Sequence, residues 1–217
     1  MDQTLPLSVP TLLTSYTLAF RRDARQLVAW GYEDARSIIN SQREETEITG
    51  FIAEAIENRL DDPQTPKRFD HYAISEDKPI SGHNLTGKSR RRLDIVIGSN
   101  ESRPRAKYVF EAKRLLTGSH PIGKYTDLQG LQRFTSGKYA SQYPEAAMIG
   151  YMQNKNADYW YKELFDNFAK DKSKSLSIIA TLEKISVLPE FQNEWLSKHK
   201  RNDNSIIDIY HIFLDCT

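Results

Sequence analysis

The chain has 217 residues, a length that fits one domain or one domain with a helical extension and is too short for two full domains. Hydrophobic residues make up 39% of the chain and charged residues 27%, which excludes a disordered or low-complexity protein. The net charge of +1 excludes only a uniformly basic nucleic-acid binder. The single cysteine, Cys216, excludes an intramolecular disulfide and zinc sites built on several cysteines.

The beginning of the chain and its apolar content predict a cytoplasmic protein. Residues 1–6 lack the basic region and apolar run of a leader peptide. No stretch of the sequence approaches the roughly 18 consecutive apolar residues that a membrane span needs. Together with the use of one cysteine, this predicts a reducing compartment and no membrane partner.

The apolar pattern changes from helical to strand-like spacing along the chain. Helical spacing covers residues 9–30 and 32–60, and Asp61-Asp62-Pro63 would end the second stretch. The later elements, in order, are strands at 69–74, 92–97 and 107–113, a helix at 125–139, a strand at 146–152, a helix at 158–169, and strands at 175–185 and 206–214. The order predicts an α/β fold whose mixed sheet is flanked by helices, with residues 1–40 as an N-terminal helical extension and 41–217 as the main domain.

The two strands around the turn-rich loop 98–105 carry the residues with the most chemical meaning. Side chains alternate across a strand, so Glu111 and Lys113 share one face while Phe110 and Ala112 point to the other. In a symmetric hairpin Asp94 lies opposite Glu111. Two opposed carboxylates repel unless one is protonated or a cation lies between them. Hard oxygen ligands of this kind suit Mg²⁺ or Mn²⁺.

Asp94 followed by Glu111-Ala112-Lys113 on the next strand, after a helix rich in glutamate, resembles the PD-(D/E)XK phosphodiesterase superfamily of restriction-endonuclease-like nucleases. The resemblance covers roughly residues 44–152, and Leu93 replaces the proline that precedes the aspartate of the motif. It implies a restriction-endonuclease-like fold and a metal-dependent nuclease. Asp94, Glu111 and the carbonyl of Ala112 would bind the metal, and Lys113 would orient the attacking water or stabilise charge on the phosphate.

Members of that superfamily often bring a glutamate from the first helix to the metal. The candidates are Glu44, Glu45 and Glu47. Glu44 and Glu47 share a face beside Ile48 and Phe51, while Glu45 rotates away, so we expect Glu47 at the metal, with Glu44 as the alternative. Taken without the resemblance, these glutamates are more often helix N-terminal charges.

Charge is distributed unevenly along the chain. Residues 1–87 carry a net charge of −5, residues 88–138 carry +8 and residues 139–217 carry −2. The basic segment includes the proposed metal hairpin and the helix after it, where a phosphate backbone would lie. The residues that we expect to bind nucleic acid are Lys88, Arg90, Arg91, Arg103, Arg105, Gln132 and Arg133.

One further motif and several histidines have competing interpretations. Residues 82–89 match the G-x-x-x-x-G-K-[ST] phosphate loop, but a strand, not a helix, is expected after them. The segment therefore fits a basic loop better than a nucleotide-binding site. His211 falls inside a predicted strand, which favours a structural role. His199 stands in a charged run that is more often solvated than bound to phosphate.

The sequence predicts a Mg²⁺- or Mn²⁺-dependent nuclease that acts on DNA rather than RNA, with Asp94, Glu111 and Lys113 as the catalytic set and Glu47 assisting. The resemblance alone suggests a role in restriction or antiviral defence. Specificity would come from the N-terminal helices, a homodimer or a partner protein subunit. Two alternatives stay open: a catalytically silent nucleic-acid-binding or assembly subunit, and a nucleotide-binding protein that uses residues 82–89.

Overall fold

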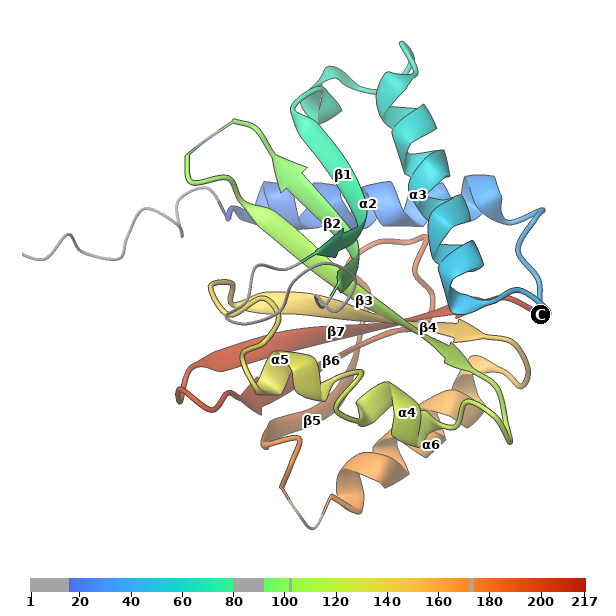
Figure 1. The fold of residues 1–217 in the computed structure, drawn as a ribbon, viewed down its shortest axis with the longest axis vertical. Helices are drawn as coiled ribbons and strands as arrows, with labels where there is room; N and C mark the ends of the chain where they lie inside the picture. The colour runs from blue at the N-terminus through green and yellow to red at the C-terminus, as the bar shows by residue number, and fades with distance from the viewer. Residues whose placement is uncertain (1–15, 80–91, 102, 172–173) are drawn as a thin grey trace, which may run out of the picture.

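The strands of the chain form one mixed seven-stranded sheet in the order β1-β2-β3-β4-β7-β6-β5 (Figure 1). The computed structural model describes residues 16–79, 92–101, 103–171 and 174–217. The strands are β1 (Tyr72–Pro79), β2 (Arg92–Ser99), β3 (Lys107–Leu115), β4 (Glu145–Met152), β5 (Ile178–Ile185), β6 (Glu194–Lys200) and β7 (Ile206–Asp215). The helices are α2 (Leu18–Ala35), α3 (Glu45–Asp61), α4 (Ile122–Thr126), α5 (Gln132–Thr135) and α6 (Ala157–Ala169), with a short 3₁₀ helix at Lys67–Phe69. The predicted α/β class with a flanked mixed sheet is confirmed.

The first three strands form the expected antiparallel meander. Ile95 pairs with Phe110 and Gly98 with Lys107, which is the symmetric register that the turn-rich loop predicts. Beyond β3 the sheet becomes parallel, since β4 runs parallel to both β3 and β7. The predicted strand at 146–152 is therefore a central one, and every residue of β4 is buried.

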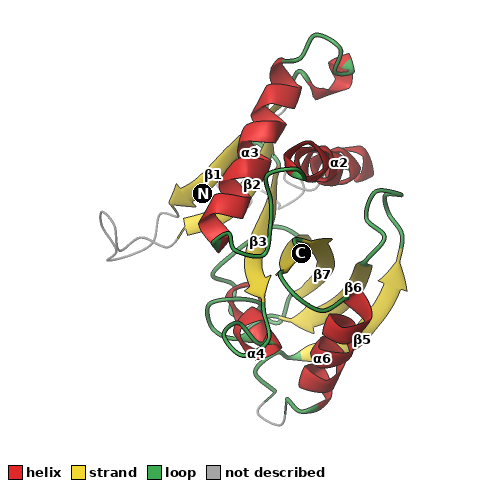
Figure 2. Cartoon of the chain, turned by 90° about the vertical axis from the view of Figure 1, so that its right-hand side faces the viewer, coloured by secondary structure: helices red, strands yellow, loops and turns green. Residues whose placement is uncertain are grey.

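Helices cover both faces of the sheet (Figure 2). On one face α2 and α3 enclose a core with the even-numbered residues of β3, such as Phe110 and Ala112. On the other face α4, α5 and α6 enclose a second core with Val109 and Leu115. The alternation of β3 thus divides its side chains between two hydrophobic cores. Among the described residues no helix is long and apolar enough to cross a membrane.

The N-terminal helix α2 belongs to the core of the domain. Phe20, Leu27 and Val28 are buried in the same cluster as α3 and the sheet. An ion pair of 2.5 Å between Arg21 and the buried Glu145 also connects α2 to β4. A division at residue 40 therefore does not coincide with a break in the core.

The prediction of one helix over residues 125–139 is wrong. The segment contains only the last two residues of α4 and the four residues of α5, which are separated by a turn that includes Gly130. A Cβ at Gly130 would lie 2.1 Å from the carbonyl oxygen of Tyr125, which shows how closely the backbone folds back on itself. The N–H of Leu131 donates to that same carbonyl at 2.9 Å. This backbone contact interrupts the helix and directs α5 toward the sheet.

Sequence analysis does not predict the strand β6, and it assigns His199 to a solvated charged run. In the structure Ser197 and His199 are completely buried, while Lys198 and Lys200 face outward. Ser197 Oγ lies 2.7 Å from Nε2 of both His199 and His211. His211 also hydrogen-bonds to the Tyr125 hydroxyl at 3.0 Å, as expected for a structural histidine.

The crossing of α2 and α3 depends on Gly31. A Cβ there would lie 2.7 Å from the carbonyl oxygen of Ile52 and 2.6 Å from Cγ1 of Ile56. Because the backbone oxygen cannot yield without moving α3, we expect Gly31→Ala to lower the free energy of unfolding by about 1–3 kcal/mol, measured in urea. The control is Gly123→Ala in α4, where no heavy atom lies within 4 Å. A loss of stability no greater than the control's would contradict this packing.

The buried histidines make stability depend on pH. Burial lowers the pKa of His199 from 6.5 to about 4, against the opposing effect of its bond to the Leu176 carbonyl, and holds the pKa of His211 well below its usual range. Between pH 6.5 and pH 4 the histidine is therefore protonated in the unfolded chain and neutral in the folded chain. The free energy of unfolding falls as the pH drops from 6.5 toward 4. We expect His199 alone to contribute a loss of about 2 kcal/mol between pH 7 and pH 5, measured by urea unfolding. His199→Gln should reduce this slope, and His71→Gln, outside the network, should leave it unchanged.

Candidate functional site

The site lies where β2 separates from β3. The register of the two strands extends to the pair Ile95–Phe110, and two carboxylates then take the place of the neighbouring strand. Asp94 Oδ2 accepts the N–H of Ala112 at 2.7 Å, and Glu45 Oε2 accepts the N–H of Arg114 at 3.1 Å. Both carboxylates are thereby fixed to the backbone of β3. One comes from β2 and the other from the first turn of α3.

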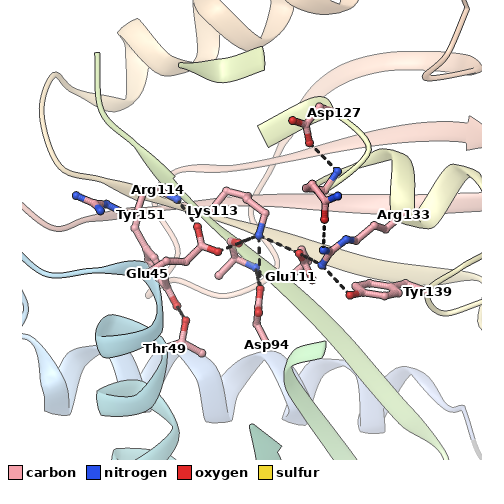
Figure 3. A network of polar contacts seen from close by, with 12 residues as sticks. Glu45, Thr49, Asp94, Glu111, Lys113, Arg114, Asp127, Arg133, Tyr139 and Tyr151 are labelled. Carbon is pink, nitrogen blue, oxygen red and sulfur yellow. Dashed lines mark hydrogen bonds and ion pairs between the residues drawn. The ribbon is translucent and has the colours of Figure 1, made fainter. Parts of the chain in front are cut away.

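The ammonium of Lys113 lies at the centre of this arrangement (Figure 3). Its Nζ is 2.9 Å from Glu111 Oε1, 3.0 Å from Glu45 Oε1 and 3.9 Å from Asp94 Oδ2. It also donates to the carbonyl of Ala112 at 2.6 Å. Four oxygen-bearing groups from α3, β2 and β3 therefore surround one cationic atom. This is the arrangement that the alternation of β3 predicts for Glu111 and Lys113.

Glu111 has no exposed surface, although its side chain ends in a carboxyl group. Arg133 from α5 donates to Glu111 Oε1 at 2.6 Å, so that Arg133 and Lys113 bind the same oxygen. The other oxygen, Oε2, is buried and has no hydrogen-bond partner among the described residues. A buried carboxylate is costly without opposite charges, and two cations supply them here.

Burial and the charge of neighbouring carboxylates raise the pKa values of Glu111 and Asp94. The pKa of Glu111 rises to about 8, first because of burial and then because of the nearby Asp94 charge, while Lys113 and Arg133 oppose the shift. Burial also raises the pKa of Asp94, against the effects of Lys113 and the Ala112 N–H. Burial alone would lower the pKa of Lys113, but the three surrounding carboxylates outweigh it and raise that pKa. The lysine is therefore a fixed cation.

The donors fit a hard divalent cation by their chemistry. Glu45, Asp94, Glu111 and the Ala112 carbonyl offer oxygen ligands only, and Glu111 Oε2 is an acceptor without a partner among the described residues. Within the described ranges, however, no group of three or more acidic, histidine or cysteine side chains is arranged so that it could hold a metal ion. The oxygens are organised around the Lys113 ammonium instead. An open cavity of about 220 Å³ adjoins them, lined by Glu45, Thr46, Thr49, Glu76 and Asp94.

The helix glutamate at the site is Glu45, not the expected Glu47 or its alternative Glu44. Glu47 accepts the backbone N–H of Glu44 and pairs with Arg43 on the exposed side of the helix. Glu44 pairs with Arg114. The buried stripe of α3 explains the difference, since Ile48, Thr49, Ile52 and Ile56 face the sheet and Glu45 is the residue one turn before Ile48 and Thr49. The sequence contains this pattern, but choosing Phe51 instead of Ile52 as the guide selects the wrong face.

The residues expected to bind nucleic acid do not form one group. Arg133 contacts Glu111, whereas Gln132 points elsewhere and bonds to Ser175. Arg103 and Arg105 are exposed in the loop before β3, roughly 25 Å from Lys113 at about 3.3 Å per residue. Lys88, Arg90 and Arg91, together with the phosphate-loop motif at 82–89, lie outside the described residues.

Comparison of the chain with protein-family models, with curated proteins and with solved structures found no match. The arguments for function therefore depend on the geometry of the site and on the sequence motif.

The central role of Lys113 in neutralising the carboxylates can be tested by double-mutant analysis. Lys113→Met leaves several acidic groups without their shared cation, and we expect it to lower the free energy of unfolding by about 3–5 kcal/mol. In the background of Glu111→Gln the same change should cost at least about 1 kcal/mol less, because one of the carboxylates that repel each other around Lys113 has been removed. As a control, Lys198→Met removes an ion pair with Asp208 that is partly exposed and should cost less than about 1 kcal/mol. Additive effects of the two site substitutions would contradict the coupling.

Proposed function

We propose that the protein is a metal-dependent nuclease of the restriction-endonuclease-like type that hydrolyses phosphodiester bonds, with DNA as the favoured substrate. The observation that carries this proposal is the convergence of Glu45, Asp94, Glu111 and the Ala112 carbonyl on the Lys113 ammonium. Three carboxylates held around a lysine at the end of a hairpin combine ligands for a hard cation with a donor for phosphate.

Each side chain has a defined part in this chemistry. Glu45, Asp94, Glu111 and the Ala112 carbonyl would hold Mg²⁺ or Mn²⁺. The bound cation supplies a water of lowered pKa and a counter-charge for the phosphate. Lys113 donates hydrogen bonds to the attacking water or to the phosphate oxygens, because its raised pKa keeps it protonated. Asp94 and Glu45 are held in position by the hydrogen bonds that they accept from the backbone N–H groups of Ala112 and Arg114.

The topology around the site also supports the proposal. An antiparallel meander of three strands continues into the parallel pair β3–β4, with α3 before it and α4 and α5 after it. A glutamate-bearing helix before the motif strands and a helix after them are the elements on which the resemblance to the PD-(D/E)XK superfamily rests. The segment that carries the motif, residues 88–138, also has a net charge of +8, which favours an anionic substrate.

The proposal predicts metal-dependent cleavage that requires Glu45 and does not require Glu47. Purified protein should cleave plasmid or linear DNA with Mg²⁺ or Mn²⁺ and not with EDTA. Glu45→Gln, Asp94→Asn and Lys113→Ala should each reduce the rate by at least about 100-fold, because each removes a ligand or the phosphate donor. Glu47→Gln should leave the rate unchanged, since its carboxylate contacts Arg43 and the Glu44 backbone. Cleavage that survives Lys113→Ala would overturn the nuclease assignment.

One observation favours a second candidate, a catalytically silent nucleic-acid-binding subunit. The Lys113 ammonium pairs with Glu45 and Glu111, and such a neutralised cluster would also suit a binding protein that keeps the fold. Such a protein would bind DNA in EDTA and would not cleave it with any divalent cation. A gel-shift assay beside the cleavage assay separates the two candidates.

A further inference from the structure

The guanidinium of Arg133 is directed toward Glu111, and its side chain is half-buried. Nη1 donates to Glu111 Oε1 at 2.6 Å and to the Tyr139 hydroxyl at 2.7 Å, and Nη2 donates to Gln129 Oε1 at 2.6 Å (Figure 3). The guanidinium carbon also lies 4.9 Å from the centre of the Tyr139 ring. Several contacts therefore fix both its position and its orientation. An arginine held in this way is poorly suited to bind a phosphate backbone, the role that the sequence suggests.

These contacts determine which oxygen of Glu111 is occupied. Arg133 and Lys113 both bind Oε1, and Oε2 stays buried without a hydrogen-bond partner among the described residues. A carboxylate rotates easily about its last bond unless one of its oxygens is anchored. Arg133 approaches from α5, whereas Lys113 shares β3 with Glu111, so the arginine supplies an anchor that the strand alone does not.

We propose that Arg133 is a positioning residue that anchors Glu111 through Oε1 and thereby leaves Oε2 available to bind a divalent cation. This inference rests on the proposed function for the identity of the ligand. Partners that orient metal-binding side chains usually change metal affinity by 10–100-fold when they are removed. A simple electrostatic role predicts the reverse, because removal of a positive charge near the site would strengthen cation binding.

Direct measurement of Mn²⁺ binding by electron paramagnetic resonance tests the proposal without relying on cleavage. Arg133→Ala should weaken Mn²⁺ binding by about 10–100-fold relative to the wild-type chain. Arg133→Lys should restore part of that loss, since an ammonium can still bind Oε1. Gln129→Ala removes only the support of Nη2 and should produce a smaller loss. Arg68→Ala, an exposed arginine paired with Asp23, is the matched control and should not change the affinity.

The outcomes separate this inference from the proposed function. Unchanged or tighter Mn²⁺ binding in Arg133→Ala would overturn the positioning role while the nuclease proposal stands. Weaker Mn²⁺ binding in Arg133→Ala, with a wild-type protein that cleaves no DNA, would support the positioning role and reject the nuclease. A wild-type protein that binds no Mn²⁺ would overturn both. DNA affinity in EDTA should be equal in Arg133→Ala and wild type, and a loss confined to DNA binding would reassign Arg133 to phosphate contact.

Discussion

The burial of one carboxylate determines how the centre of this protein is built. Glu111 occupies a central strand with no exposed surface, and an ionised group in such a place is tolerated only when opposite charge and hydrogen bonds replace the lost water. Lys113 supplies one charge from the same strand and Arg133 supplies the other from α5. The position of α5 therefore follows from electrostatics as well as from apolar packing. Glu45 and Asp94 contribute two further carboxylates that pair with the Lys113 ammonium.

The separation of β2 from β3 allows these groups to meet. A fully paired strand would place a carbonyl where Asp94 now accepts the N–H of Ala112, and the first turn of α3 could not reach Arg114. Because the two carboxylates accept these hydrogen bonds, the N–H groups of residues 112 and 114 keep their partners, and the carboxylates gain fixed positions. The two hydrogen bonds that replace strand pairing at the edge of β3 thus also fix the carboxylates of the site.

The elements that sequence analysis predicts correctly are those fixed by local rules. The alternation of β3 places Glu111 and Lys113 on one face, and the symmetry of the loop places Asp94 near them. The pairing of β2 with β3 nevertheless ends at Ile95–Phe110, one residue before the expected Asp94–Glu111 pair. The failures involve tertiary contacts. The face of α3 that meets the sheet decides between Glu45 and Glu47, and α3 carries apolar residues on more than one side. The break at Gly130 depends on a backbone approach that spacing does not reveal. Sequence analysis misses β6 because three of its four buried residues, Glu194, Ser197 and His199, are polar and Trp195 alone is apolar.

The two helical layers on opposite faces of the sheet have a consequence for how the site assembles. Glu45 belongs to the layer of α2 and α3, and Arg133 belongs to the layer of α4, α5 and α6. The complete charge network therefore exists only when both layers are docked, so it depends on contacts between distant parts of the chain and not on the hairpin alone. The same network would open first if either layer loosened, which makes it a sensitive reporter of local unfolding in the native state.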